Sequence, residues 1–182
     1  MRLYLVQHGE ARSEAEDPLR PLTVRGEREV RRSSEGAKRL NVRPSKIFHS
    51  GKLRAEQTAE IIAEGLKISG SSPQFVQGLN PNDDVLPWAE RIANQTEDLM
   101  LVGHLPFLEK LASYLLGGNE NSKLVLFQYG AIVCLEQKEG KGWAVRWIFT
   151  PEMWLRGQTI GRSVTLLAII PNILPNEGSG FH

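Results

Sequence analysis

The feature that most constrains the fold is a stretch near the start of the chain, residues 3–9. In it, four apolar residues lead directly into Gln7, His8 and Gly9. A run of this length and composition is typical of a buried strand, and Gly9 ends it. A second apolar run, residues 99–103, also stops directly before a histidine, His104. Because open parallel sheets bind ligands at the carboxyl ends of their strands, both histidines are candidates for a site there. Taken alone, His8 fits a nucleophile, a base, a metal ligand or a hydrogen-bonded core residue.

Strand and helix patterns alternate along the first 150 residues. Short apolar runs predict further strands at residues 47–50, 74–76 and 99–103. Helical periodicity predicts helices at residues 24–40, 52–66, 85–96 and 106–117. Two more strands, residues 131–136 and 143–149, flank a predicted hairpin turn. This order predicts an α/β fold: a three-layer α/β/α sandwich with a mostly parallel sheet and an antiparallel edge.

Composition excludes several classes of protein. The chain has 182 residues and a formal net charge of +1, which fits one domain and argues against a general nucleic-acid or membrane-surface binder. Its single cysteine, Cys134, rules out an internal disulfide framework and is read as a buried hydrophobe. We see no signal peptide, and the apolar run at residues 166–170 is too short to span a bilayer, so a cytoplasmic protein is expected. The many arginines of the helix at 24–40 are interpreted as a solvated face.

The helix predicted at residues 52–66 has basic residues in its first turn, at the end where the helix dipole disfavours them. We expect Ser50 to be its N-cap, and its first turn holds Lys52 and Arg54, although the helix dipole favours acids there. Cations at that position are reasonable where the helix start holds an anion. Arg20 follows the first strand and can fold over the same rim as His8 and His104. Two arginines and two histidines make an oxyanion or phosphate pocket. They do not make a metal site, because no carboxylate or cysteine accompanies the histidines at ligand spacing.

Four segments in order, spanning about residues 1–150, resemble motifs of the histidine phosphatase superfamily. The chain resembles most the small phosphohistidine phosphatases of the SixA type, with a phosphoglycerate mutase-like fold. The four segments are 7–11 (Gln-His-Gly-Glu-Ala), 20–23 (Arg-Pro-Leu-Thr), 50–59 around Arg54, and 103–106 (Gly-His-Leu-Pro). The resemblance implies a phosphatase domain at residues 1–155, followed by a C-terminal tail at residues 156–182. We leave open whether that tail is loosely ordered, a packed arm or an oligomer contact.

The resemblance also implies a metal-independent mechanism without a cofactor. His8 would attack phosphorus and form a covalent phosphohistidine, which water then hydrolyses. Arg54, Arg20 and His104 would hold the phosphate oxygens, with His8, Arg54 and His104 as the catalytic residues. Substrate-binding residues would be Gln7, Gly9, Arg20 and Leu105, where Gly9 lets the backbone approach the phosphate. We expect surrounding cations to lower the pKa of His8 and keep it neutral.

Two departures from the family pattern leave the substrate open. Gln7 stands where the signature has arginine, so one charge and a two-pronged donor are missing. The case for a general acid is weak: Asp83 or Asp84 fits the role, but capping of the next helix explains both better. A missing acid favours a phosphohistidine-containing protein as substrate, because imidazole can leave protonated. The alternatives are a phosphomonoesterase for a small phosphorylated metabolite, and a phosphate-binding module that has lost catalysis.

Overall fold

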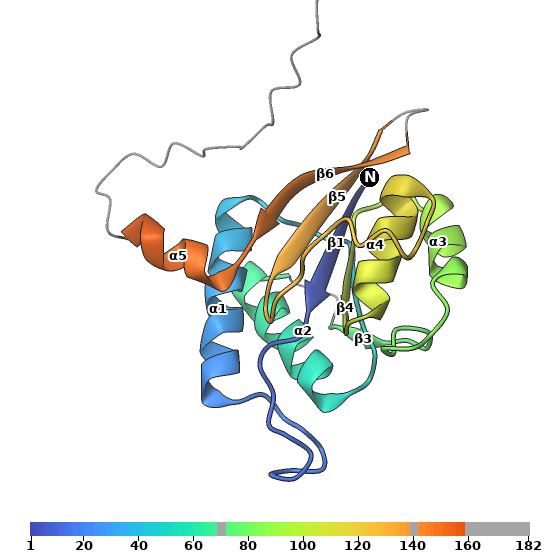
Figure 1. The fold of residues 1–182 in the computed structure, drawn as a ribbon. Helices are drawn as coiled ribbons and strands as arrows, with labels where there is room; N and C mark the ends of the chain where they lie inside the picture. Colours follow the sequence, from blue (N-terminus) through green and yellow to red (C-terminus); the bar gives the residue numbers. More distant parts are fainter. Residues whose placement is uncertain (69–71, 139–141, 159–182) are drawn as a thin grey trace, which may run out of the picture.

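A six-stranded sheet forms the centre of the molecule in the computed structural model, which describes residues 1–68, 72–138 and 142–158 (Figure 1). The strand order is β3-β2-β4-β1-β5-β6. The strands are β1 (Arg2–Gln7), β2 (Lys46–His49), β3 (Gln74–Phe75), β4 (Leu99–Gly103), β5 (Ile132–Lys138) and β6 (Gly142–Phe149). The first four are parallel, and β5 and β6 pair antiparallel along one side. The predicted mixed sheet is therefore confirmed.

Helices cover both faces of this sheet (Figure 1). They are α1 (Val24–Arg39), α2 (Leu53–Leu66), α3 (Leu86–Ala93), α4 (Phe107–Gly117) and α5 (Pro151–Gln158). The alternation of β1 explains the two cores. Leu3 and Leu5 pack in the cluster that includes residues of α3 and α4, whereas Tyr4 and Val6 pack in the cluster with residues of α1 and α2. With both faces buried, the strand reads as a continuous apolar run.

The predicted helix and strand ends are correct to within a few residues. The largest difference is in the helix expected at 85–96, which ends at Ala93. The helix expected from residue 52 begins at Leu53, and its N-cap is Lys52, which makes no side-chain capping hydrogen bond. The prediction that Ser50 caps it is wrong, because Gly51 (φ +76°) turns the chain and the helix starts too late for Ser50 to reach it.

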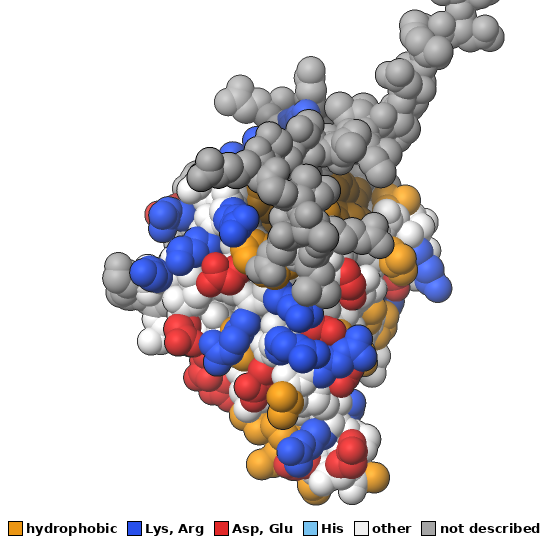
Figure 2. Space-filling model, turned by 90° about the vertical axis from the view of Figure 1, so that its left-hand side faces the viewer, with side chains coloured by type: hydrophobic (Ala, Val, Ile, Leu, Met, Phe, Trp, Pro, Cys, Tyr) orange, Lys and Arg blue, Asp and Glu red, His pale blue; other side chains and the backbone are white. Residues whose placement is uncertain are grey.

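The arginines of α1 lie on a face where both signs of charge are mixed. Arg25 pairs with Glu29 (2.8 Å) and Arg31 with Glu64 (3.3 Å). Figure 2 shows basic and acidic side chains interspersed over the face that carries α1. This agrees with the interpretation of these arginines as a solvated face.

The chain after β6 continues into α5, which packs against α1. The guanidinium of Arg39 lies 4.3 Å from the ring centre of Trp154, a cation–π contact between the two helices. Most of the predicted tail at residues 156–182 lies outside the described residues, as do residues 139–141 of the predicted hairpin turn. Among the helices that the structure describes, none is long and apolar enough to cross a membrane.

Candidate active site

The carboxyl ends of β1 and β4 bring two of the predicted catalytic residues together. The backbone N–H of His8 donates to the carbonyl oxygen of Gly103 (3.1 Å), so the pairing of the strands continues to the histidine itself. His104 follows Gly103 directly, and the ring centres of His8 and His104 are 4.8 Å apart. Arg54, the second residue of α2, donates from Nε to Nε2 of His8 (3.2 Å). Thus His8, His104 and Arg54 meet at one rim, as the sequence predicts.

Two hydrogen bonds fix the protonation state of His8. Its Nδ1 lies 2.7 Å from the carbonyl oxygen of Gly9, which can only accept, so Nδ1 carries the hydrogen. Its Nε2 accepts from Arg54, so Nε2 carries the lone pair. The two contacts agree on one neutral tautomer. The nitrogen that faces the arginine is therefore the nucleophilic one.

Burial keeps His8 neutral. The side chain is 7% exposed, and burial lowers its pKa to about 4, with smaller contributions from the Arg54 and Arg20 charges. The hydrogen bond to Gly9 opposes this shift. The expectation of a neutral nucleophile holds, but its main cause is burial rather than the surrounding cations.

His104 is buried more deeply and is also neutral. Burial, with smaller contributions from His8 and from the charges of Arg54, Lys52 and Arg20, lowers its pKa to about 3. Its Nε2 lies 2.6 Å from the hydroxyl oxygen of Ser50, so Ser50 contacts this histidine instead of capping α2. Its Nδ1 has no hydrogen-bond partner among the described residues. His104 therefore brings no fixed charge to the site.

Thr58 ties α2 to the loop after β1. Its hydroxyl oxygen accepts from the backbone N–H of Gly9 (3.0 Å) and donates to the carbonyl oxygen of Arg54 (2.7 Å). One turn of α2 thus sets the position of both the arginine and the nucleophile's neighbour. Because Lys52 makes no side-chain cap, the first N–H groups of α2 remain available to an anion.

A cationic pocket of about 420 Å³ opens at the start of α2. Its lining residues are Glu14, Pro18, Leu19, Arg20, Gly51, Lys52, Leu53, Arg54 and Glu56. Arg20 is held at this mouth, with φ +49° and a hydrogen bond from its Nε to the carbonyl oxygen of Arg12 (3.2 Å). The pocket therefore contains both predicted arginines, and His8 contacts one of them, Arg54, without lining the pocket itself. Its carboxylates, Glu14 and Glu56, were not expected from the sequence.

The structure gives other roles to several predicted residues. The N–H of Gly9 bonds to Thr58, and a Cβ at Gly9 would come within 2.7 Å of Cγ2 of Val30, so this glycine serves packing against α1. Leu105 packs against the apolar cluster under α3 and α4 and does not line the pocket. Asp83 accepts from the N–H of Asn80 (2.7 Å), and Asp84 accepts from the N–H of Leu86 at the start of α3 (3.0 Å). Asp84 therefore bonds to the first N–H of α3, as the capping interpretation predicts, whereas Asp83 bonds within the preceding turn and does not cap the helix.

Gln7 is buried beside the nucleophile with an unused acceptor. The residue is 7% exposed, and its side-chain oxygen has no hydrogen-bond partner within the described part of the chain. A buried polar atom without a partner is unfavourable unless a ligand or water satisfies it. Gln7 therefore remains a candidate ligand contact, as predicted from its place in the motif.

Sequence reasoning missed Tyr129. Its ring centre lies 5.5 Å from that of His8. The neighbouring Gly130 donates its N–H to the carbonyl oxygen of Gln7 (3.1 Å), which fastens the loop between α4 and β5 to the end of β1. No motif surrounds Tyr129 in the sequence, so only the sheet order reveals that this loop reaches the site.

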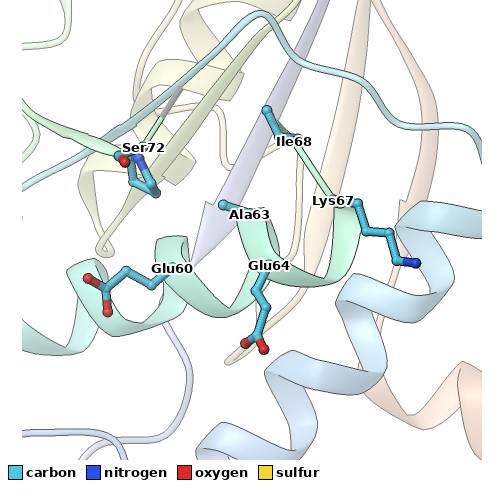
Figure 3. A pocket seen from close by; sticks show the side chains of 7 residues that line it. Glu60, Ala63, Glu64, Lys67, Ile68 and Ser72 are labelled. Carbon is cyan, nitrogen blue, oxygen red and sulfur yellow. The ribbon is translucent and has the colours of Figure 1, made fainter. Parts of the chain in front are cut away.

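A second pocket, of about 610 Å³, lies toward the other end of α2. Figure 3 shows that its carboxylates, from Glu60 and Glu64, lie on successive turns of that helix. It contains one cation, Lys67, and no histidine among its lining residues. Its charge does not suit a phosphate. No group of three His, Cys, Asp or Glu side chains that could hold a metal ion occurs in the described ranges.

The lowered pKa values predict a specific acid sensitivity. Below the unfolded value of about 6.5, the unfolded chain binds protons that buried His8 and His104 do not bind until about pH 4 and 3. Stability is therefore lost as the pH falls from about 6.5, on the order of 1 to 2 kcal/mol per histidine by pH 5. We expect urea denaturation to show that the free energy of unfolding falls less between pH 7 and pH 5 in His104→Gln than in the wild type. Equal losses would contradict it, since the carboxylates common to both proteins cancel.

Comparisons with known proteins agree with this geometry. A family model described as the histidine phosphatase superfamily (branch 1) matches residues 3–80. An uncharacterized protein of Picosynechococcus sp. is 37% identical over 139 residues, covering 72% of this chain and 83% of that protein. Phosphohistidine phosphatase SixA of Escherichia coli K12 is 28% identical over 156 residues, covering 83% and 94%. A solved structure of the protein histidine phosphatase SixA with tungstate has a TM-score of 0.73 at 26% identity, covering 84% and 99%. The chain therefore belongs to the histidine phosphatase superfamily.

Proposed function

We propose that the protein hydrolyses phosphohistidine on a protein, through a covalent phosphohistidine intermediate on His8. The observation that carries this proposal is the neutral His8 whose Nε2 lone pair points to Arg54. A nucleophile for phosphorus needs an unprotonated nitrogen next to a group that stabilises the developing negative charge. Both conditions are met at this nitrogen. The similarity to the SixA phosphatase supports the choice of substrate class.

In the first half of the reaction, Nε2 of His8 attacks phosphorus in line with the leaving nitrogen. The bond between phosphorus and the substrate's imidazole breaks, its electron pair stays on that nitrogen, and the imidazole takes up a proton from solvent. Arg54 moves its hydrogen bonds from His8 to the phosphate oxygens. Arg20 adds charge from the mouth of the pocket, and His104 adds a hydrogen bond.

In the second half, a water molecule attacks phosphorus on His8. The bond between phosphorus and Nε2 breaks, its electron pair returns to Nε2, one proton of the water passes to a phosphate oxygen, and inorganic phosphate leaves. The hydrogen bond from Nδ1 to the carbonyl oxygen of Gly9 holds the ring in one orientation through both steps. The imidazole leaving group explains how the reaction proceeds although Asp83 and Asp84 are engaged in turns.

A phosphomonoesterase remains the second candidate, because Glu14 and Glu56 line the pocket. An alkoxide leaving group needs a proton donor, and either carboxyl can supply one there. The test compares kcat/KM for a phosphohistidine peptide, p-nitrophenyl phosphate and a sugar phosphate. We expect kcat/KM to be roughly a hundredfold higher for the phosphohistidine peptide than for the sugar phosphate, because imidazole is the better leaving group where no proton is donated. A preference for the sugar phosphate would overturn the proposal in favour of the esterase.

A further inference from the structure

Three large hydrophobic side chains are exposed around the cationic pocket. They are Leu19 (70% exposed), Phe75 (59%) and Tyr129 (47%). Leu19 lines the pocket itself. The ring of Phe75 lies against Gly51, which also lines the pocket, and the ring of Tyr129 lies beside His8. They come from the β1–α1 loop, β3 and the α4–β5 loop, so distant parts of the chain each contribute one.

Leu19 is exposed by a structured turn. Its backbone N–H donates to the side-chain carboxylate of Asp17 (2.9 Å), and the N–H of Arg20 donates to the carbonyl oxygen of Asp17 (2.9 Å). These two bonds form an Asx-type turn. The turn that brings Arg20 to the pocket therefore also fixes Leu19 beside it.

Phe75 is likewise held in place. It pairs with His49 across β2 and β3, and the N–H of Val76 donates to the carbonyl oxygen of His49 (3.0 Å). A Cβ on Gly51 would come within 2.6 Å of Cδ2 of Phe75. The ring thus rests on a glycine at the edge of the pocket instead of entering the core.

Tyr129 is presented by a loop with anchors on both sides. Phe127 is buried, the side chain of Gln128 donates to Glu152 on α5 (2.6 Å), and Gly130 bonds to the end of β1. The aromatic ring is therefore fixed while nearly half of it stays in contact with water. Exposed apolar groups held around one site are a mark of an interaction surface, and aromatic residues are enriched there.

We propose that Leu19, Phe75 and Tyr129 form a docking rim for a protein whose phosphorylated residue is flanked by apolar side chains. The inference rests on the proposed function and deepens it by describing the substrate's surroundings. The pocket cations Arg20, Lys52 and Arg54 complement the phosphate, and the rim complements apolar surface around it. A free phosphorylated metabolite has no such surface with which to cover the three side chains.

The test uses two phosphohistidine peptides of equal length and charge, one with leucine and phenylalanine beside the phosphohistidine and one with serine and glycine there. We expect the wild type to prefer the apolar peptide by about tenfold in kcat/KM, a ratio that three partly buried side chains readily produce. The triple variant Leu19→Ser, Phe75→Ser, Tyr129→Ser is expected to lose this preference. The single variant Leu19→Ser should lose part of it.

The matched control replaces two hydrophobic residues of similar exposure outside the rim, Val145 (43%) and Met153 (49%), by serine. This variant should keep the wild-type preference. Absence of preference in the wild type, or a preference that persists in the triple variant, overturns the docking rim alone. If the wild type turns over p-nitrophenyl phosphate but neither peptide, the proposed function fails and the rim fails with it.

Discussion

Replacing His8 by alanine is expected to abolish turnover, by roughly a thousandfold or more, while the fold persists. The variant removes the nucleophilic Nε2, which accepts from Arg54 while the carbonyl oxygen of Gly9 holds the hydrogen on Nδ1. Without it, no covalent intermediate can form, and the remaining cations can only bind phosphate. Steady-state kinetics and circular dichroism on the same preparation measure the two parts of this prediction.

Rapid acid-free quenching with a radiolabelled substrate gives a second measurement. The wild type should trap an acid-labile phosphate on the protein, and His8→Ala should trap none. This experiment also separates an enzyme from a phosphate-binding module, since a binding module traps no label in either form. Substantial turnover by His8→Ala would refute the mechanism.

His49 supplies a matched control for this substitution. It is a buried histidine at the end of β2, which is separated from β1 by β4, and its Nδ1 accepts from the backbone N–H of Gly51 (3.3 Å). The residue type, burial and sheet edge are the same as for His8. His49→Asn should keep the chemistry within a few-fold of wild type, because roughly 1 kcal/mol of local hydrogen bonding changes while the nucleophile stays.

The positions of His8 and His104 followed from the sequence because they depend on a short-range rule. An apolar run that stops at a glycine or histidine marks a strand end, and parallel strands bring their ends to one edge. Arg54 followed for a similar reason, since a cation in the first turn of a helix is unfavourable without an anion. The positions of these three residues could be predicted without knowledge of side-chain packing.

The contacts that the sequence did not predict all depend on tertiary structure. Ser50 resembled a helix cap, yet its hydroxyl reaches His104, because one left-handed glycine delays the helix. Tyr129 has no local pattern, and its position beside His8 arises from the hydrogen bond of Gly130 to the end of β1. Gly9 was assigned to phosphate approach from its motif, whereas the distance to Val30 shows a packing role.

The electrostatics of the pocket were predicted in direction but not in cause. Cations near His8 suggested a lowered pKa, and the pKa is lowered, yet burial contributes more than Arg54 or Arg20. Burial of a single ring depends on every element around it and is not readable from a motif. This cause matters for Gln7, which stands where the family signature has arginine. The missing positive charge is tolerated in the buried, unliganded site, but it is needed in the transition state, where negative charge develops.

Gln7→Arg is expected to raise kcat/KM by about ten- to a hundredfold. An arginine adds a charge-assisted hydrogen bond to the phosphate, which contributes on the order of 1.5–3 kcal/mol in the transition state. The same substitution places a buried cation near Arg54 and Arg20, so the unliganded variant should be less stable than the wild type. Inorganic phosphate should then raise the melting temperature of Gln7→Arg more than that of the wild type, because the anion compensates the added charge.

Gln137→Arg is the control for a general effect of added charge. Gln137 lies near the end of β5, at the end of the sheet where Arg2 pairs with Glu136. The site lies at the opposite end, where Val6 pairs with Ile132. This variant should change neither kcat/KM nor the response to phosphate. A lower rate in a folded Gln7→Arg would show instead that the pocket is built around the glutamine. The side-chain oxygen of Gln7, which has no hydrogen-bond partner among the residues that the structure describes, would then act as an acceptor for a hydrogen of the substrate, a contact that arginine cannot make.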